Sequence, residues 1–243
     1  MFAKRKMDKK YGFTKETTTV DNHVLHRIVA LKDFVAVYGY EVHKGDLGGW
    51  IEKEENLSQE GGCWVCDNAR VCGYARVHAN ARVSDNALVS GDARVCDNAW
   101  VRANAQVCDA AQVSGYAVVS DNARVSGDAL VSDNTWVHGN ARVRDNAQVS
   151  GYAWVCDNAR VCDSGCITSS KDYFCVGPIG SRNDTTTFYR GRDHKIYVSC
   201  GCFNGDIDEF KKQVEETHKD NEKHKNDYLK AIELALSRLE IAS

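Results

Sequence analysis

The chain of 243 residues contains a single proline and two methionines, and it has no long run of apolar residues. No segment reaches the roughly 18 apolar residues that a membrane-spanning helix needs. No secretory leader or lipidation box is present either, so we expect a cytoplasmic protein with no membrane partner. An excess of one charge is also missing, since the formal net charge is −3. This balance disfavours nucleic acid as a partner.

Cysteine, in contrast, is abundant, with 11 residues. Six of them occupy one position of a six-residue repeat in which serine is the commonest residue. None of these six has another cysteine eighteen residues away. We therefore interpret them as serine substitutes in a reducing compartment and expect neither a disulfide scaffold nor a metal site there. These six are Cys66, Cys72, Cys96, Cys108, Cys156 and Cys162.

Residues 63 to 164 form seventeen consecutive hexapeptides, and a degenerate eighteenth occupies 165–170. Each reads Ala, any residue, Val, a small polar residue, then Asp or Gly, and finally Asn, Asp or Tyr. Alternation places the Ala and the Val on one face of a short strand, and the last two residues form a corner. The repeats lack proline, so every backbone N–H can pair in a sheet. A fixed short period of this kind predicts a mainly β fold, a parallel β-helix.

Three hexapeptides would close one coil of eighteen residues, which gives about six coils. Support for this register comes from one corner, where every eighteenth residue is asparagine and the amides can hydrogen-bond from coil to coil. The asparagines of this predicted ladder are Asn68, Asn86, Asn104, Asn122, Asn140 and Asn158.

The same register places four of the five tryptophans on one outward face. The combined apolar area of these indoles is near or above the largest patch that a monomer usually exposes, so something should cover them. Self-association, with a trimer favoured, is our first interpretation. An aromatic platform for a sugar, a base or a partner protein, and coverage by the chain's own termini, are the alternatives. The predicted interface residues are Trp64, Trp100, Val118, Trp136 and Trp154.

The two ends do not repeat. Residues 1–62 should cap the open end of the β-helix (63–170), with a tight turn at 45–50 where the chain enters it. Residues 171–243 should form a small α+β module, in which the runs 173–176, 185–190 and 196–202 suggest an antiparallel meander. Asp206 to Glu209 resembles a capping box that opens a helix. The apolar face of a last helix is predicted at Leu229, Ile232, Leu236 and Leu239.

The loop at 177–187 contains glycines, hydroxyl side chains and one arginine. A guanidinium suits phosphate or carboxylate, so the loop is a candidate anion site, although its composition somewhat favours a structured β-hairpin without a ligand. Three cysteines nearby, Cys175, Cys200 and Cys202, are candidate metal ligands with His194, His218 or His224. Because a Cys-x-Cys pair in a strand points to one face, we favour core cysteines and predict no metal or cofactor. The predicted ligand-binding residues are Gly180, Ser181, Arg182, Thr185, Thr186 and Thr187.

The repeats resemble the hexapeptide-repeat, left-handed β-helix superfamily, and the entry segment Gly48 to Val65 is similar to that of bacterial members labelled as acyltransferases. This resemblance implies a left-handed winding and an acyl-CoA-dependent enzyme with a histidine base, for which His138 is the candidate. The segments GPIGSR, TTTFYR and CGCF resemble a module of phage and mobile-element proteins, which implies an accessory role in anti-defence.

Three functions follow. We favour a non-catalytic, oligomeric protein that sequesters a phosphate-bearing, nucleotide-like molecule. Acyl transfer and a structural or protein-docking scaffold are the alternatives.

Overall fold

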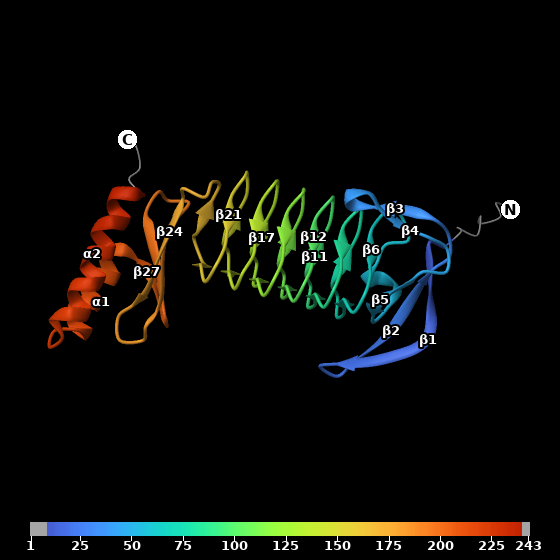
Figure 1. Cartoon of the computed structure of the whole chain (residues 1–243), viewed down its shortest axis with the longest axis horizontal. Helices are drawn as coiled ribbons and strands as arrows, with labels where there is room; N and C mark the ends of the chain where they lie inside the picture. The colour runs from blue at the N-terminus through green and yellow to red at the C-terminus, as the bar shows by residue number, and fades with distance from the viewer. Residues whose placement is uncertain (1–8, 240–243) are drawn as a thin grey trace.

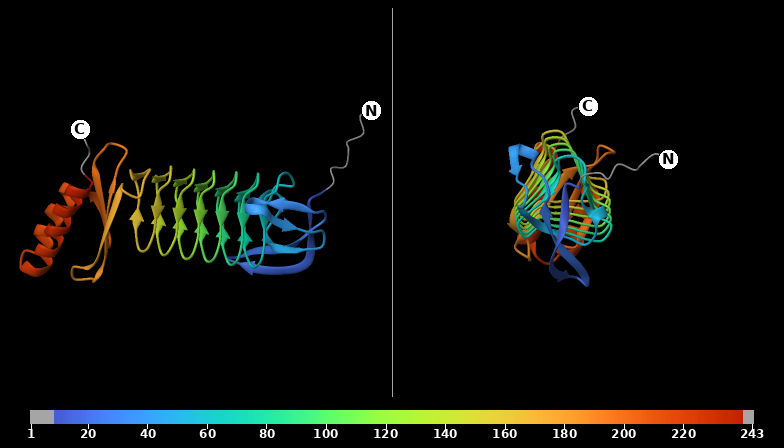
Figure 2. Two further views of the ribbon diagram at one scale, coloured as in Figure 1. Left: turned by 45° about the horizontal axis from the view of Figure 1, so that its top comes forward. Right: turned by 90° about the vertical axis from the view of Figure 1, so that its right-hand side faces the viewer.

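Each hexapeptide folds into a two-residue strand and a corner, and the strands stack into three parallel sheets (Figures 1 and 2). This computed structural model describes residues 9–239. Parallel pairing joins residues eighteen apart, such as Trp100 with Val118 and Val118 with Trp136. The predicted register is therefore confirmed. Alternation directs the Ala and Val of each repeat inward, where both are fully buried in most coils.

The three sheets form the three faces of the solenoid. The tryptophan face consists of β6 (Trp64–Val65), β9 (Arg82–Val83), β12 (Trp100–Val101), β15 (Val118–Val119), β18 (Trp136–Val137) and β21 (Trp154–Val155). The arginine face consists of β5 (Leu47–Ile51), β7 (Arg70–Val71), β10 (Leu88–Val89), β13 (Gln106–Val107), β16 (Arg124–Val125), β19 (Arg142–Val143) and β22 (Arg160–Val161). The third face consists of β8 (Arg76–Val77), β11 (Arg94–Val95), β14 (Gln112–Val113), β17 (Leu130–Val131), β20 (Gln148–Val149) and β23 (Cys166–Ile167).

The corners explain why Asp, Gly and Asn recur at the last two repeat positions. The predicted asparagine ladder is present, with amide contacts of 3.2–3.5 Å from each coil to the next. Most aspartates at the fifth position adopt a positive φ, near +60° for Asp85 and Asp121, which this residue type tolerates better than most. Their carboxylates also accept a backbone N–H from the next coil, as Asp97 does from Gly115 at 3.1 Å. Sequence reasoning missed this second ladder.

The N-terminal end consists of β1 (Tyr11–Val20), β2 (His23–Ala30), β3 (Phe34–Ala36), η1 (Val37–Gly39), β4 (Tyr40–Val42) and η2 (Glu54–Asn56), together with β5. Residues 45–50 were predicted to form a tight turn, but Leu47–Ile51 form β5, in which Trp50 pairs in parallel with Arg70. The solenoid therefore has about seven turns. Gly49 allows this pairing, since an added Cβ would lie 2.6 Å from the Ala69 carbonyl oxygen.

The C-terminal end is a four-stranded antiparallel meander followed by two helices (Figure 1). Its elements are β24 (Tyr173–Ile179), β25 (Asp184–Arg190), β26 (Ile196–Cys200), β27 (Phe203–Asp206), α1 (Ile207–Thr217) and α2 (Glu222–Arg238). One face of the sheet packs on the last coil through Tyr189, and the other packs on the helices through Phe188 and Val198. The module therefore covers the open end of the solenoid.

The helices follow the sequence prediction in part. Asp206 caps α1 by accepting from the backbone N–H of Glu209, and the Glu209 side chain completes the capping box. The predicted apolar face of α2 is wrong at Leu236, which is 44% exposed, because Ala231 and Ala235 face the sheet instead. Neither helix in residues 9–239 has the length and apolar character required to cross a membrane.

Candidate functional site

A pocket of about 410 Å³ opens on the helix-bearing side of the C-terminal sheet. The turn between β24 and β25 contributes Ser181 and Arg182, and the turn between β26 and β27 contributes Cys202. One face of α1 contributes Gln213 and Thr217. Helix α2 contributes Tyr228, so four segments that are distant in the sequence meet here. Arg182 is the only permanently charged side chain in the described lining of this pocket.

Two glycines place Arg182 at the pocket. Gly180 has a φ of +69°, and a side chain there would clash with the ring and hydroxyl of Tyr228. Gly201 has a φ of +61°, and an added Cβ would lie 2.6 Å from a guanidinium nitrogen of Arg182. Glycine at both positions therefore provides the turn conformation and lets the arginine lie across the opposite turn. The guanidinium contacts the Cys202 sulfur at 3.8 Å and is otherwise exposed.

The floor of the pocket is aromatic. Tyr228 is buried, and its ring stacks on His218 at a centroid distance of 5.5 Å. Burial raises the pKa of Tyr228, with the neighbouring Cys200 adding to the effect, so its hydroxyl stays protonated at neutral pH. Phe203 lies 5.1 Å from Phe210 on the adjoining wall. The pocket thus combines one cation at its mouth with ring faces inside.

The predicted hydroxyl residues of β25 lie elsewhere. Thr186 and Thr187 are buried on opposite faces of the sheet, and Thr186 donates its hydroxyl proton to the Cys200 sulfur. The Thr187 hydroxyl accepts the backbone N–H of Arg160 at 3.0 Å, which satisfies a donor of the last coil that no further coil can pair. Thr185 is half-buried beside Gly177. Of the predicted set, only Ser181 and Arg182, positioned by Gly180, line the pocket.

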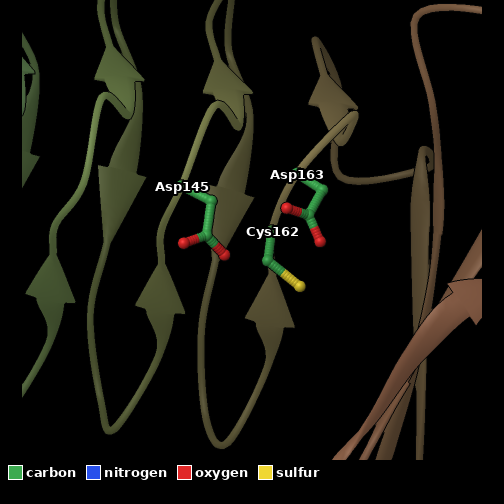
Figure 3. Close-up of side chains that lie close together, drawn as sticks. All are labelled: Asp145, Cys162 and Asp163. Atoms are coloured by element: carbon green, nitrogen blue, oxygen red, sulfur yellow. The ribbon is translucent and has the colours of Figure 1, made fainter.

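The sequence had suggested that the Cys-x-Cys segment lies within a strand. This is wrong, because β26 ends at Cys200 and the chain turns at Gly201. Cys175 packs toward the solenoid and Cys200 toward the helices, so the three thiols do not converge. Within residues 9–239, the one group of metal-type donors that does converge is Asp145, Cys162 and Asp163 (Figure 3). Sequence reasoning missed this group.

Protein partners already surround that group. Arg144 forms an ion pair with Asp145 at 3.3 Å and contacts the Cys162 sulfur at 3.7 Å. The amide of Asn204 donates to Asp163, and its oxygen accepts from the Cys162 thiol and from the Tyr189 hydroxyl. Burial raises the pKa of Cys162, which keeps the thiol neutral. The group therefore links the last coils to the C-terminal sheet through one ion pair and several hydrogen bonds.

The tryptophan face is covered by the chain itself at its N-terminal end. Trp64 is 1% exposed beneath Phe34, and Trp100 is partly covered by Tyr38 at a ring distance of 5.6 Å. Val118 is buried as well. Coverage by a terminus, one of the predicted alternatives, thus accounts for half of this face.

The rest of the face remains open. Trp136 and Trp154 are 39% and 52% exposed and stack on each other at 5.3 Å. His138 lies beside them, with its ring edge-on to Trp154 and its Nδ1 3.8 Å from an Asp121 carboxylate oxygen. The histidine predicted as a base is thus partly exposed and next to a carboxylate. His138 is not among the described residues that line the pocket around Arg182.

Two comparisons with known proteins found similarities. A family model described as a YdcK beta solenoid repeat matches residues 81–97 and 123–139. The protein named "Uncharacterized acetyltransferase YdcK" of Escherichia coli (strain K12) is 42% identical to this chain over 53 residues. That segment covers 22% of this chain and only 15% of the relative. This chain thus carries β-solenoid repeats similar to those of YdcK.

Proposed function

We propose that this protein is a non-catalytic binding protein that sequesters a small anionic molecule in the C-terminal pocket. The observation that carries the proposal is the exposed guanidinium of Arg182 at the mouth of a pocket whose described lining contains no acidic side chain. A guanidinium can donate two parallel hydrogen bonds to a phosphate or carboxylate. Ser181 adds a hydroxyl beside it.

Phosphate matches the site better than carboxylate does. The mouth of the pocket is exposed, so a single ion pair there gains little unless the anion accepts several hydrogen bonds. A phosphate offers three acceptor oxygens to the guanidinium and the hydroxyl at once. The ligand is therefore proposed to be phosphate-bearing.

Replacing Arg182 by alanine is expected to weaken binding of inorganic phosphate at least tenfold, because the fork of charged donors is lost. Isothermal titration calorimetry measures the effect, and Arg182→Lys should recover only part of it. Arg94→Ala, which removes an exposed guanidinium from the third face, is the matched control and should bind as the wild type does. Equal affinity in Arg182→Ala and Arg94→Ala would disprove the proposed site.

We further propose that the protein self-associates through Trp136 and Trp154, with a trimer favoured. Two stacked and exposed indoles present a flat apolar surface that water solvates poorly. We expect Trp154→Ser to shift the protein toward monomer in sedimentation velocity. Tyr74→Ser, which removes a 72% exposed ring from a corner, should not. A wild-type monomer at micromolar concentration would contradict this assembly.

Acyl transfer is the second candidate function, and the pair of His138 and Asp121 favours it. A carboxylate beside a histidine orients the imidazole and supports its role as a base. The similarity to a protein named as an acetyltransferase adds weight, although it covers 15% of that protein. Under our main proposal, His138→Ala leaves phosphate binding unchanged in calorimetry. Release of coenzyme A from acetyl-CoA by the wild type, lost in His138→Ala, would favour the enzyme instead.

A further inference from the structure

The C-terminal pocket has two chemically different halves. Its mouth carries Ser181 and Arg182, which suit an anion. Its inner half consists of Phe203, Phe210 and the stacked pair His218 and Tyr228. An inorganic anion would use only the first half and would leave the aromatic half in contact with water. The inner half therefore indicates what else the ligand contains.

We infer that the ligand is a monophosphate ester of a molecule with a flat aromatic ring, such as a nucleoside monophosphate. This inference rests on the proposed binding of an anion at Arg182. The pocket volume of about 410 Å³ falls within the range of small-molecule sites and far exceeds the need of a phosphate alone.

The ring would lie against the open aromatic surfaces of the inner half. Phe210 and Tyr228 are buried and form the floor of the pocket. Phe203 and His218 are only partly buried and present ring surface to the pocket. Stacking on aromatic side chains stabilises a bound flat ring in such a site. A saturated chain would lose this contribution, so we favour an aromatic ring.

The single charge limits the number of phosphates. Each further phosphate group of a di- or triphosphate would add another negative charge, and Arg182 is the only permanent cation in the described lining. The described lining also contains no acidic side chain that could hold a divalent metal ion to neutralise them. Among phosphate esters, a monophosphate leaves the least negative charge unbalanced beside a single guanidinium.

Polar groups on α1 distinguish a nucleobase from a simple aryl ring. The exposed Gln213 side-chain amide donates to the Thr217 hydroxyl at 2.8 Å. Its carbonyl oxygen accepts no hydrogen bond within the described residues and can accept one from an amino group on a base. Both side chains line the pocket next to the aromatic half.

Calorimetric titration of the full chain with inorganic phosphate, phenyl phosphate, AMP and ATP tests the inference. We expect phenyl phosphate to bind at least tenfold tighter than phosphate, and ATP to bind no tighter than AMP. Phe203→Leu, which keeps an apolar side chain but removes the ring, should lower the affinity for phenyl phosphate several-fold and leave that for phosphate unchanged. If Gln213→Ala weakens AMP but not phenyl phosphate, the natural ligand carries a base; equal loss or no loss indicates a simpler aryl phosphate.

The outcomes separate the inference from the function on which it rests. Phosphate and phenyl phosphate binding with equal affinity would overturn the aromatic ligand while leaving anion binding intact. ATP binding tenfold tighter than AMP would overturn the monophosphate. Failure of every phosphate to bind to the folded wild type would refute the proposed function itself. Circular dichroism of Phe203→Leu and Gln213→Ala establishes that each variant is folded.

Discussion

Replacing Val113 by asparagine is expected to lower the free energy of unfolding by about 3–5 kcal/mol. Val113 is fully buried in the third face and stacks between Val95 and Val131 of the neighbouring coils. The substitution removes an apolar side chain from the interior and leaves an amide there without hydrogen-bond partners. Because every coil contacts only its neighbours, the loss also weakens the coupling between the two halves of the solenoid.

Urea denaturation followed by circular dichroism measures the change. Gln112→Asn is the matched control, since this exposed residue lies on the outward side of the same strand. The control should change the free energy of unfolding by less than about 0.5 kcal/mol. A small effect of Val113→Asn would mean that the side chains of this face do not point inward as described.

Alkaline pH is expected to destabilise the protein. Burial raises the pKa of several thiols above the ordinary value of 9.0, to about 12 for Cys66 and about 11 for Cys175. In the unfolded chain these thiols ionise near pH 9, whereas in the folded chain they keep their protons. The folded state therefore binds more protons, and its stability falls as the pH rises from about 9 toward about 12. Each pKa unit corresponds to about 1.4 kcal/mol for a well-buried group.

One group acts in the opposite direction. Burial lowers the pKa of Lys10, whose ammonium group donates to the Cys63 carbonyl oxygen at 2.9 Å, and this group alone would make stability rise with pH. Several thiols and buried tyrosines outweigh it, so the net slope should be negative. Urea denaturation in reducing buffer at pH 8 and pH 10.5 measures this slope, and Cys66→Ser should reduce it. Stability that is constant or rises over this range would contradict the expected burial of the thiols.

Much of the fold could be predicted because the repeats encode it locally. The eighteen-residue register followed from Asn68, Asn86 and their successors, since only one number of sides per coil aligns them. The residues that cover Trp64 and Trp100 could not be found in this way. Phe34 and Tyr38 lie in a non-repeating segment, and their positions depend on tertiary packing that no period reveals.

The candidate site shows the same division. Ser181 and Arg182 stood out because glycines and an arginine occur together in one loop. The ring residues of the pocket gave no comparable signal, since Phe203, Phe210 and Tyr228 belong to a strand and two helices that meet only in the folded chain. Thr187 had the composition of a ligand residue, but its position opposite Arg160 gives its hydroxyl a structural hydrogen bond. Composition alone could not separate these two roles.

Native mass spectrometry of protein purified gently from its expression host tests the central proposal most directly. We expect an oligomer that carries an additional mass of a few hundred daltons, and we expect Arg182→Ala to lack this mass while keeping the same oligomeric state. An oligomer of the wild type without any added mass, or an added mass that persists in Arg182→Ala, would contradict ligand binding at this pocket and would favour a role in protein docking.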